Sequence, residues 1–269
     1  MITFSQLGKY GAIGNQLFQY ATLYSIGKIN SYEVKIPKTE EHFDEGTSRI
    51  QHYFLNCFDD INVNILKDED LIDIKYNIHW PNMIFNENIL KIPDHSNLQG
   101  YFQSFKYFEQ YKIDLLKQFN FKQSVKQKIY NKYDIDYSKY SSIHLRCGDY
   151  FHRKHIHPVM DFEYYSEALN FLNTENYLVF SDTIEKAKET FSKIKNINFI
   201  YIDGNHAFED LFLMSLCKNN IIANSSFSWW GAYLNKNNPK IVGPSNWFGK
   251  GYREPWNIND IIPKEWKTI

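Results

Sequence analysis

From residue 140 onward, short apolar stretches alternate with longer amphipathic ones, and this alternation limits the fold more than any other feature of the sequence. The apolar stretches predict strands at 141–146, 177–181, 198–202, 221–224 and 240–243, and the segments between them predict helices at 162–172, 184–194, 208–218 and 227–234. Alternation of this kind builds a parallel sheet with helices on both faces. Such sheets bind ligands at the carboxyl ends of their strands, so polar residues at those ends are candidates for a site.

The first half of the chain predicts a second α/β domain from a weaker version of the same pattern. Strands are predicted at 1–6, 33–36 and 98–102, a helix opens at Asn15, and another follows a cap at Ser104. Residues 39–97 are irregular and polar, and we interpret them as a variable region. The charged segment 122–139 lacks an apolar strand. We therefore expect two Rossmann-like domains, 1–138 and 139–269, each with a parallel sheet, and a cleft between them.

Residues 220–232 read Asn-Ile-Ile-Ala-Asn-Ser-Ser-Phe-Ser-Trp-Trp-Gly-Ala, so an apolar strand ends in Asn and Ser where an aromatic helix begins. The first N–H groups of a helix have no partner within it, and nearby hydroxyls add donors. This pattern indicates a phosphate site at Ser225 and Ser226. The alternative is ordinary helix capping by these serines, with Trp229 and Trp230 in the core.

His144 and Arg146 alternate with apolar residues at the end of the strand at 141–146, so both point to one face. Burying an arginine is costly unless it meets an anion. Its planar fork matches a diphosphate. The alternative partner within the chain is Asp149.

Two further polar clusters follow predicted strands. Ser181 and Asp182 end the strand at 177–181, and a carboxylate there can accept hydrogen bonds from a base amide or from ribose hydroxyls. The alternative is that Asp182 caps the next helix. Near the start of the chain, two glycines precede Asn15 and Gln16, whose amides would lie at a helix start close to a ligand. A plain tight turn is the alternative there.

Composition excludes several other classes of function. The formal net charge of −1 argues against a nucleic-acid binder that works by bulk electrostatics. The three cysteines form no disulfide or metal pattern, which favours a reduced, cytoplasmic setting. We expect no signal peptide, no membrane span and no metal site, because the acidic triplets 68–70 and 134–136 and the histidines at 152, 155 and 157 complete no ligand pattern.

Four stretches together resemble the bacterial α-1,2-fucosyltransferases of glycosyltransferase family 11. They are 14–21 (Gly-Asn-Gln-Leu-Phe-Gln-Tyr-Ala), 144–150 (His-x-Arg-x-Gly-Asp-Tyr), Ser181-Asp182, and 210–230. The resemblance covers both ends of the chain and most of its second half, but not 39–97. It implies a GT-B architecture and an inverting, metal-independent enzyme. That enzyme would move L-fucose from GDP-fucose to the 2-hydroxyl of a terminal galactose in a surface glycan, such as an O-antigen repeat.

The resemblance also implies roles for individual residues. Arg146 would hold the donor diphosphate, and His144 and Asp182, beside Ser181, would contact the guanine. The pyrophosphate end would be lined by Ser225, Ser226, Phe227 and Ser228, and Asn15 and Gln16 would approach the sugar-phosphate from the other domain. One departure is Cys147, where many relatives have arginine, so this chain has one positive charge fewer near the donor.

The implied transfer also needs a base for the acceptor hydroxyl proton. Asp149 is the first candidate and His155 the second, although Asp149 can instead orient Arg146. Domain 1–138 would face the acceptor and domain 139–269 would bind the GDP-sugar. The expected partners are GDP-fucose and a galactose-terminated or lipid-linked glycan, with peripheral contact at the inner face of the membrane left open. Two alternatives remain: another GDP-sugar or linkage, and a non-catalytic binding protein of the same fold.

Overall fold

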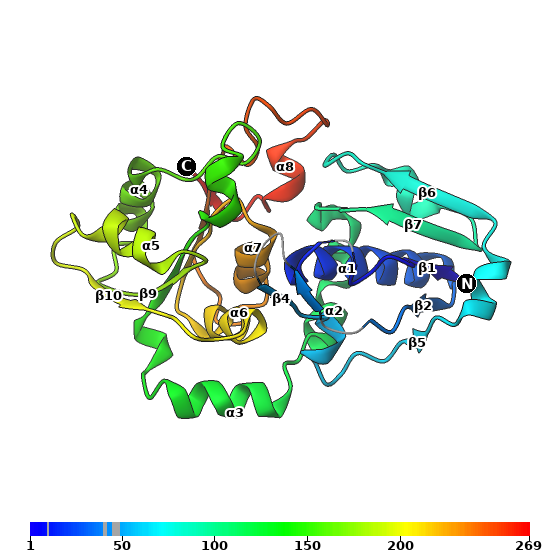
Figure 1. The fold of residues 1–269 in the computed structure, drawn as a ribbon, viewed down its shortest axis with the longest axis horizontal. Helices are drawn as coiled ribbons and strands as arrows, with labels where there is room; N and C mark the ends of the chain where they lie inside the picture. The colour runs from blue at the N-terminus through cyan, green and yellow to red at the C-terminus, as the bar shows by residue number, and fades with distance from the viewer. Residues whose placement is uncertain (10, 40–41, 45–48) are drawn as a thin grey trace. The chain divides into compact units, whose positions relative to one another are not determined.

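The computed structural model describes residues 1–9, 11–39, 42–44 and 49–269, and the chain forms two compact units (Figure 1). The first unit comprises Met1–Lys122 and Glu254–Pro263, and the second comprises Gln123–Arg253 and Lys264–Ile269. Near its end, the chain therefore returns to the first unit and then contributes its last residues to the second. The acceptor-side and donor-side roles of the two domains remain predictions.

A parallel sheet with the strand order β5-β2-β1-β7-β6 forms the centre of the first unit. Its strands are β1 (Ile2–Thr3), β2 (Val34–Ile36), β5 (Asn64–Ile65), β6 (Tyr76–Trp80) and β7 (Ser96–Gly100). Helix α1 (Ile13–Asn30) packs against β1 and β2. The unit also contains the short helices α2 (Lys112–Gln118) and α8 (Ile258–Ile261) and an antiparallel pair, β3 (His42–Asp44) and β4 (Arg49–Gln51).

Besides shifts at the ends of β1 and β7, which were predicted at 1–6 and 98–102, the first unit differs from prediction in three places. Helix α1 begins at Ile13, two residues before Asn15. Ser104 makes no capping bond, and two 3-10 turns precede α2 because Phe108 leaves the helical region (φ −135°, ψ 6°). Within 39–97 the structure has β5 and β6, which are largely exposed strands at the two ends of the sheet order and so lack an apolar run. Residues 40–41 and 45–48 of that stretch lie outside the described residues.

The second unit contains a six-stranded parallel sheet with the order β10-β9-β8-β11-β12-β13. Its strands are β8 (Ser141–Leu145), β9 (Asn176–Ser181), β10 (Asn198–Tyr201), β11 (Asn220–Ile221), β12 (Ile241–Gly243) and β13 (Lys267–Thr268). Its helices are α3 (Gln123–Lys132), α4 (Phe162–Leu172), α5 (Ile184–Phe191), α6 (Ala207–Leu216) and α7 (Ser226–Tyr233). The predicted alternation is confirmed, whereas β13 was not predicted because it is two exposed residues long.

Side chains on the two faces of β8 show that helices cover both sides of this sheet. Ile143 and Leu145 join an apolar cluster with residues of α4 and α5. His144 points the other way, and its ring lies 5.5 Å from the ring of Phe227 in α7. Helix α6 packs against α7 on this second side. The two-sided covering predicted from the alternation is therefore confirmed.

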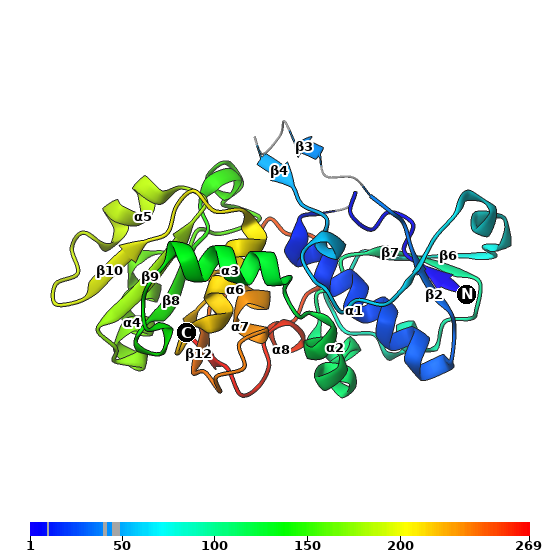
Figure 2. The same ribbon diagram turned by 90° about the horizontal axis from the view of Figure 1, so that it is seen from below.

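Helix α3 occupies the charged segment that was predicted as a boundary, and Figure 2 shows it alongside α6. Lys128 Nζ lies 2.6 Å from the buried carboxylate of Glu209. One turn later, Lys132 Nζ donates to the carbonyl of Asp203 at 3.0 Å and to Asn205 Oδ1 at 2.6 Å. The two lysines of this segment thus bind the start of α6 and the loop before it.

The strand register brings three loops to one edge of the second sheet. Leu145 of β8 pairs with Ser181 of β9, and Ile143 pairs with Ile221 of β11. The residues just past these carboxyl ends, Arg146, Asp182 and Asn224, therefore come from neighbouring strands. Within the described part of the chain, no helix is long and apolar enough to cross a membrane.

Candidate active site

Arg146 follows β8 directly, and two carboxylates hold its guanidinium. Nη1 donates to Asp182 Oδ2 at 2.5 Å, and Nη2 donates to Asp149 Oδ1. The Asp182 side chain is only 4% exposed, while that of Asp149 is 37% exposed. The attraction to Asp182 is therefore the less screened by water. The Arg146–Asp149 pair that the sequence left open is present, and Asp182 adds a second carboxylate.

The Asp182 carboxylate also holds the backbone of the loop that carries Arg146. Its Oδ1 accepts hydrogen bonds from the amides of Cys147 at 2.9 Å and Gly148 at 3.1 Å. A Cβ on Gly148 would overlap Asp182 Oδ2, so only glycine fits here without a shift. Asp182 does not cap the following helix, whose N-cap residue is Thr183. Ser181 Oγ instead accepts from the Thr183 amide at 3.0 Å.

Asn224, just past β11, joins this loop to two others. Its carbonyl accepts a hydrogen bond from the Tyr150 hydroxyl at 3.2 Å. Its side-chain Nδ2 donates to the carbonyls of Pro158 and Trp247, both at 3.0 Å. With 2% of its surface exposed, Asn224 is an internal link and not a surface side chain.

The start of α7 lies beside the end of β8. Ser225 is the N-cap residue, but its hydroxyl makes no capping bond, and Ser228 Oγ donates to the Ser225 carbonyl at 3.4 Å. The capping alternative for Ser225 is therefore not what the structure adopts. Trp229 and Trp230 are fully buried, as predicted for core residues. The positive end of the α7 dipole lies at this serine-rich turn.

A column of four rings, Tyr150, His157, Phe248 and Tyr252, leads away from Arg146; we call it the aromatic column. The Arg146 Cζ lies 5.0 Å from the centre of the Tyr150 ring. That ring stacks on His157 at 4.7 Å and 19°, His157 lies 5.6 Å from Phe248, and Phe248 stacks on Tyr252 at 3.9 Å. Burial raises the pKa of Tyr150 to about 12 and lowers the pKa of His157, so both rings are uncharged at neutral pH.

The backbone at His155 is fastened to the loop that supplies the last two rings. The His155 carbonyl accepts from the Gly251 amide at 2.7 Å, and the Ile156 carbonyl accepts from the Gly249 amide at 2.9 Å. A Cβ on Gly249 would lie 2.5 Å from the His155 carbonyl oxygen, and one on Gly251 would lie 2.8 Å from it. Two glycines thus permit a backbone-to-backbone contact. The His155 side chain itself is exposed.

In the first unit, Asn15 and Gln16 are bonded within the protein. The Gln16 side chain is fully buried, donates to the carbonyls of Gly11 and His52 at 3.2 and 3.1 Å, and accepts from the Phe54 amide at 3.0 Å. Asn15 Oδ1 accepts from Gln103, and the backbone amides of Asn15 and Gln16 both donate to the Ala12 carbonyl. Gln16 therefore shapes the glycine loop, and ligand contact by either residue remains a prediction.

The two acidic triplets are engaged in local structure. Asp70 lies 2.7 Å from Lys35 and accepts from the Lys67 amide, and the hydrogen bond from Lys35 holds its pKa below the usual range. Asp136 accepts from the amide and hydroxyl of Ser138. Among the described residues there is no group of three or more His, Cys, Asp or Glu placed to hold a metal ion.

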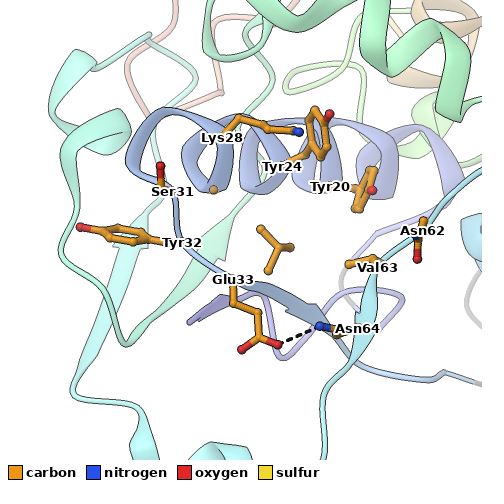
Figure 3. A pocket seen from close by; sticks show the side chains of 11 residues that line it. Tyr20, Tyr24, Lys28, Ser31, Tyr32, Glu33, Asn62, Val63 and Asn64 are labelled. Carbon is orange, nitrogen blue, oxygen red and sulfur yellow. Dashed lines mark hydrogen bonds between the residues drawn. The ribbon is translucent and has the colours of Figure 1, made fainter.

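The first unit also has a pocket of about 470 Å³ between α1 and the strands β2 and β5 (Figure 3). Tyr20, Tyr24 and Lys28 line it from α1, and Asn64 donates to Glu33 across its other side at 2.8 Å. Glu33 precedes β2, so the pocket lies at the amino ends of these strands. Ligands in open parallel sheets bind at the opposite, carboxyl ends.

A family model described as "Glycosyl transferase family 11" matches residues 5–269. This chain belongs to glycosyl transferase family 11. A relative from Escherichia coli named "O-antigen biosynthesis glycosyltransferase WbnK" is 29% identical, over 94% of this chain and 97% of its own length. An E. coli "Alpha-1,2-colitosyltransferase" is 39% identical over 48% of this chain and 47% of its own length. The "Galactoside alpha-(1,2)-fucosyltransferase 2" of Bos taurus is 24% identical, over 83% of this chain and 67% of its own length.

Solved structures with a similar fold include POFUT1 and the fucosyltransferase NodZ. POFUT1 in complex with GDP gives a TM-score of 0.56 at 11% identity, covering 89% of this chain and 96% of that one. The fucosyltransferase NodZ from Bradyrhizobium gives a TM-score of 0.52 at 11% identity, covering 86% and 91%. At this identity the likeness concerns the fold alone. It agrees with the two parallel α/β sheets described above.

The structure of this family 11 enzyme brings His144, Arg146, Asp149, Ser181, Asp182 and the turn 225–228 to the carboxyl ends of β8, β9 and β11. Three residues at this edge were given no role in the site from the sequence: Tyr150, His157 and Asn224. Tyr150 is part of the family motif, but its ring contacts join loops that are distant in sequence. Asp210, at the start of the fourth family stretch, accepts from Asn205, and burial raises its pKa to about 7.

We expect Gly148→Ala to lower the free energy of unfolding by about 1–3 kcal/mol, because the new methyl must displace the Asp182 carboxylate or the loop. In an Asp182→Ala background the same change is expected to cost less, since the obstructing group is gone. Urea unfolding of the wild type, the two single variants and the double variant forms the cycle. Equal costs in both backgrounds would show that the Gly148–Asp182 contact does not limit this position.

Proposed function

We propose that this family 11 enzyme transfers L-fucose from GDP-fucose to the 2-hydroxyl of a terminal galactose, with inversion at the anomeric carbon. The observation that carries the proposal is Arg146, which two carboxylates hold at the carboxyl edge of a parallel sheet, beside the strand that leads into α7. An oriented guanidinium and a helix start are both groups that bind a diphosphate.

The relatives support the donor, the linkage and the acceptor. Similar proteins are named as α-1,2-fucosyl-, α-1,2-colitosyl- and O-antigen glycosyltransferases. Structures of similar fold are titled as complexes with GDP, or as soaked with GDP-fucose. The proposed acceptor is therefore a galactose-terminated surface glycan, such as a lipid-linked O-antigen repeat.

In the proposed donor complex, Arg146 grips the diphosphate and the turn from Ser225 to Ser228 lines its other side. His144, which lies beside Phe227, faces the guanine. The Asp182 carboxylate is bonded to Arg146 and two amides. We therefore assign it to orienting Arg146, in place of the guanine contact expected from the resemblance.

In the proposed reaction, the acceptor hydroxyl attacks the anomeric carbon from the side opposite the diphosphate, and negative charge grows on the departing GDP. Arg146 and the first-turn amides of α7 stabilise that charge without a metal. Asp149 either takes the hydroxyl proton or holds Arg146, with His155 as the second candidate base. The ion pair with Arg146 supports the orienting role, and the exposed fraction of Asp149 leaves it accessible to an acceptor.

The finer architecture and the location belong to the same proposal. The first unit takes the acceptor side and the second unit the GDP-sugar, as in a GT-B enzyme with a cleft between its domains. A cytoplasmic protein that contacts the inner face of the membrane would meet both GDP-fucose and a lipid-linked acceptor.

A second candidate donor carries colitose in place of fucose. The observation in its favour is the 39% identity to the α-1,2-colitosyltransferase, which is confined to about half of this chain. The more extended match to the galactoside α-(1,2)-fucosyltransferase 2 of Bos taurus favours fucose. Parallel assays with both nucleotide sugars decide between them.

We expect the purified chain to release GDP from GDP-fucose in the presence of galactosides, and to keep its rate in EDTA. The reason is that a cation and helix dipoles, not a metal, neutralise the leaving group. GDP release and NMR of the product linkage are the measurements. Affinity for GDP-fucose without turnover would identify a non-catalytic binder. Loss of activity on chelation, restored by Mn²⁺ or Mg²⁺, would refute the metal-free mechanism.

Arg146→Ala is expected to remove about 2–4 kcal/mol of transition-state stabilisation, so kcat/KM falls at least about a hundredfold. Arg146→Lys should restore only part of the rate, because an ammonium cannot grip two oxygens in one plane. Arg153→Ala, an exposed arginine of the same loop, is the matched control. A folded Arg146→Ala enzyme with near-normal kcat/KM would exclude Arg146 from the site.

Asp149→Asn separates the two roles of this residue, because asparagine keeps the shape and loses the basicity. If Asp149 is the base, transfer is expected to fall by about 10²–10⁴-fold while GDP binding by calorimetry stays nearly unchanged. If GDP affinity falls in parallel, Asp149 orients Arg146. If neither quantity changes, both roles are wrong and His155→Ala is the next variant.

A further inference from the structure

The Arg146 guanidinium has two carboxylates and an aromatic ring as neighbours. Asp182 and Asp149 take hydrogen bonds from its two Nη atoms, so they fix the group within its own plane. These two hydrogen bonds restrict much less the tilt of the plane, which is its rotation about the line through the two Nη atoms. The Tyr150 ring is a third neighbour, since the guanidinium carbon lies over it, 5.0 Å from its centre. The tilt matters because a planar fork binds two phosphate oxygens only when the plane faces them.

We propose that Tyr150 and His157 are positioning residues for the transfer reaction, whose stacked rings set the tilt of the Arg146 guanidinium toward the donor diphosphate. This inference rests on the proposed function. It adds two residues that the family resemblance did not assign. Neither ring needs to touch the substrate, since both act through Arg146.

The aromatic column is held at both ends, so it can resist movement of Arg146. At the Arg146 end, the Tyr150 hydroxyl donates to the Asn224 carbonyl at 3.2 Å. At the far end, Phe248 and Tyr252 stack at 3.9 Å and 12°, and both lie within ring contact of His157. The backbone bonds of Gly249 and Gly251 keep the two loops together.

The column requires an uncharged His157. From its own loop His157 faces Asp149, Arg153 and Arg146, and from the packed rings it faces Tyr150 and Tyr252. Burial is the largest cause of its lowered pKa, the two arginines add to it, and Asp149 opposes it. A proton on His157 would place a second cation on the ring that faces Arg146. The stack is therefore complete at neutral pH, and because the pKa of His157 is lowered, it is lost only as pH falls through that lowered pKa, below the ordinary histidine value.

A double-mutant cycle tests whether the rings act through the guanidinium. Tyr150→Leu removes the ring face and is expected to lower kcat/KM for GDP-fucose roughly tenfold, within the range of cation–π contacts. In an Arg146→Lys background, the same change is expected to alter the remaining rate by less than about twofold, because an ammonium has no plane to orient. His157→Ala should behave in the same way.

Conservative variants keep the test valid if the larger changes impair folding. Tyr150→Phe and His157→Phe retain flat rings and are expected to keep most of the rate at pH 7.5. Wild type should lose activity relative to His157→Phe as the pH falls through the lowered pKa of His157. Phe171→Leu is the matched control for Tyr150→Leu. It also removes an aromatic ring beneath a cation, because Lys267 lies 6.0 Å over that ring, but it does so on another part of the unit.

Two results would overturn the proposal while the proposed function stands. One is a Tyr150→Leu effect of equal size in the wild-type and Arg146→Lys backgrounds, which would mean that the ring does not act on the guanidinium. The other is a His157→Ala effect of equal size in the two backgrounds. If the wild type transfers no fucose, the proposed function fails instead. The same cycle measured by GDP affinity in calorimetry then decides whether the column orients Arg146.

Discussion

The carboxyl edge of the second sheet depends on one buried carboxylate. Asp182 bonds the Arg146 guanidinium with one oxygen and the amides of Cys147 and Gly148 with the other. A buried charge is tolerated only when its hydrogen-bonding capacity is met, and here one cation and two backbone donors meet it. The carboxylate arrives from β9 while its partners follow β8. The site geometry is therefore a consequence of the register between these two strands.

Much of the second unit could be predicted from the sequence because its apolar periodicity is strong. The predicted helix at 162–172 has the observed bounds of α4, and the strand ends that carry the polar clusters were found within a few residues. The structure confirms buried tryptophans in α7 and helices on both faces of the sheet. The failures lie where periodicity is weak, as in the exposed strand β6 and the turns after Ser104.

The partners of the polar residues could not be predicted in the same way. The sequence located Asp182 at a strand end, where helix capping and ligand contact are both chemically reasonable. Its actual partners come from a neighbouring strand loop, and local sequence does not specify them. His157 and Phe248 meet for the same reason, through the folding together of two loops. Cys147 is buried within the core cluster, and burial raises the pKa of its thiol. An arginine at this position would therefore need a path out of that core.

The main chain at His155 is held by contacts with the two glycines, 249 and 251. These contacts fix the course of the loop, whereas its exposed side chains determine the chemistry of its surface. The segment from Phe151 to His155 is exposed, yet main-chain bonds and close main-chain approach at its end hold it in place. Side chains along such a loop can change without altering its path, whereas the glycines cannot. Substitutions at the exposed positions from Phe151 to His155 can thus alter the surface that this loop presents while its main chain keeps its course.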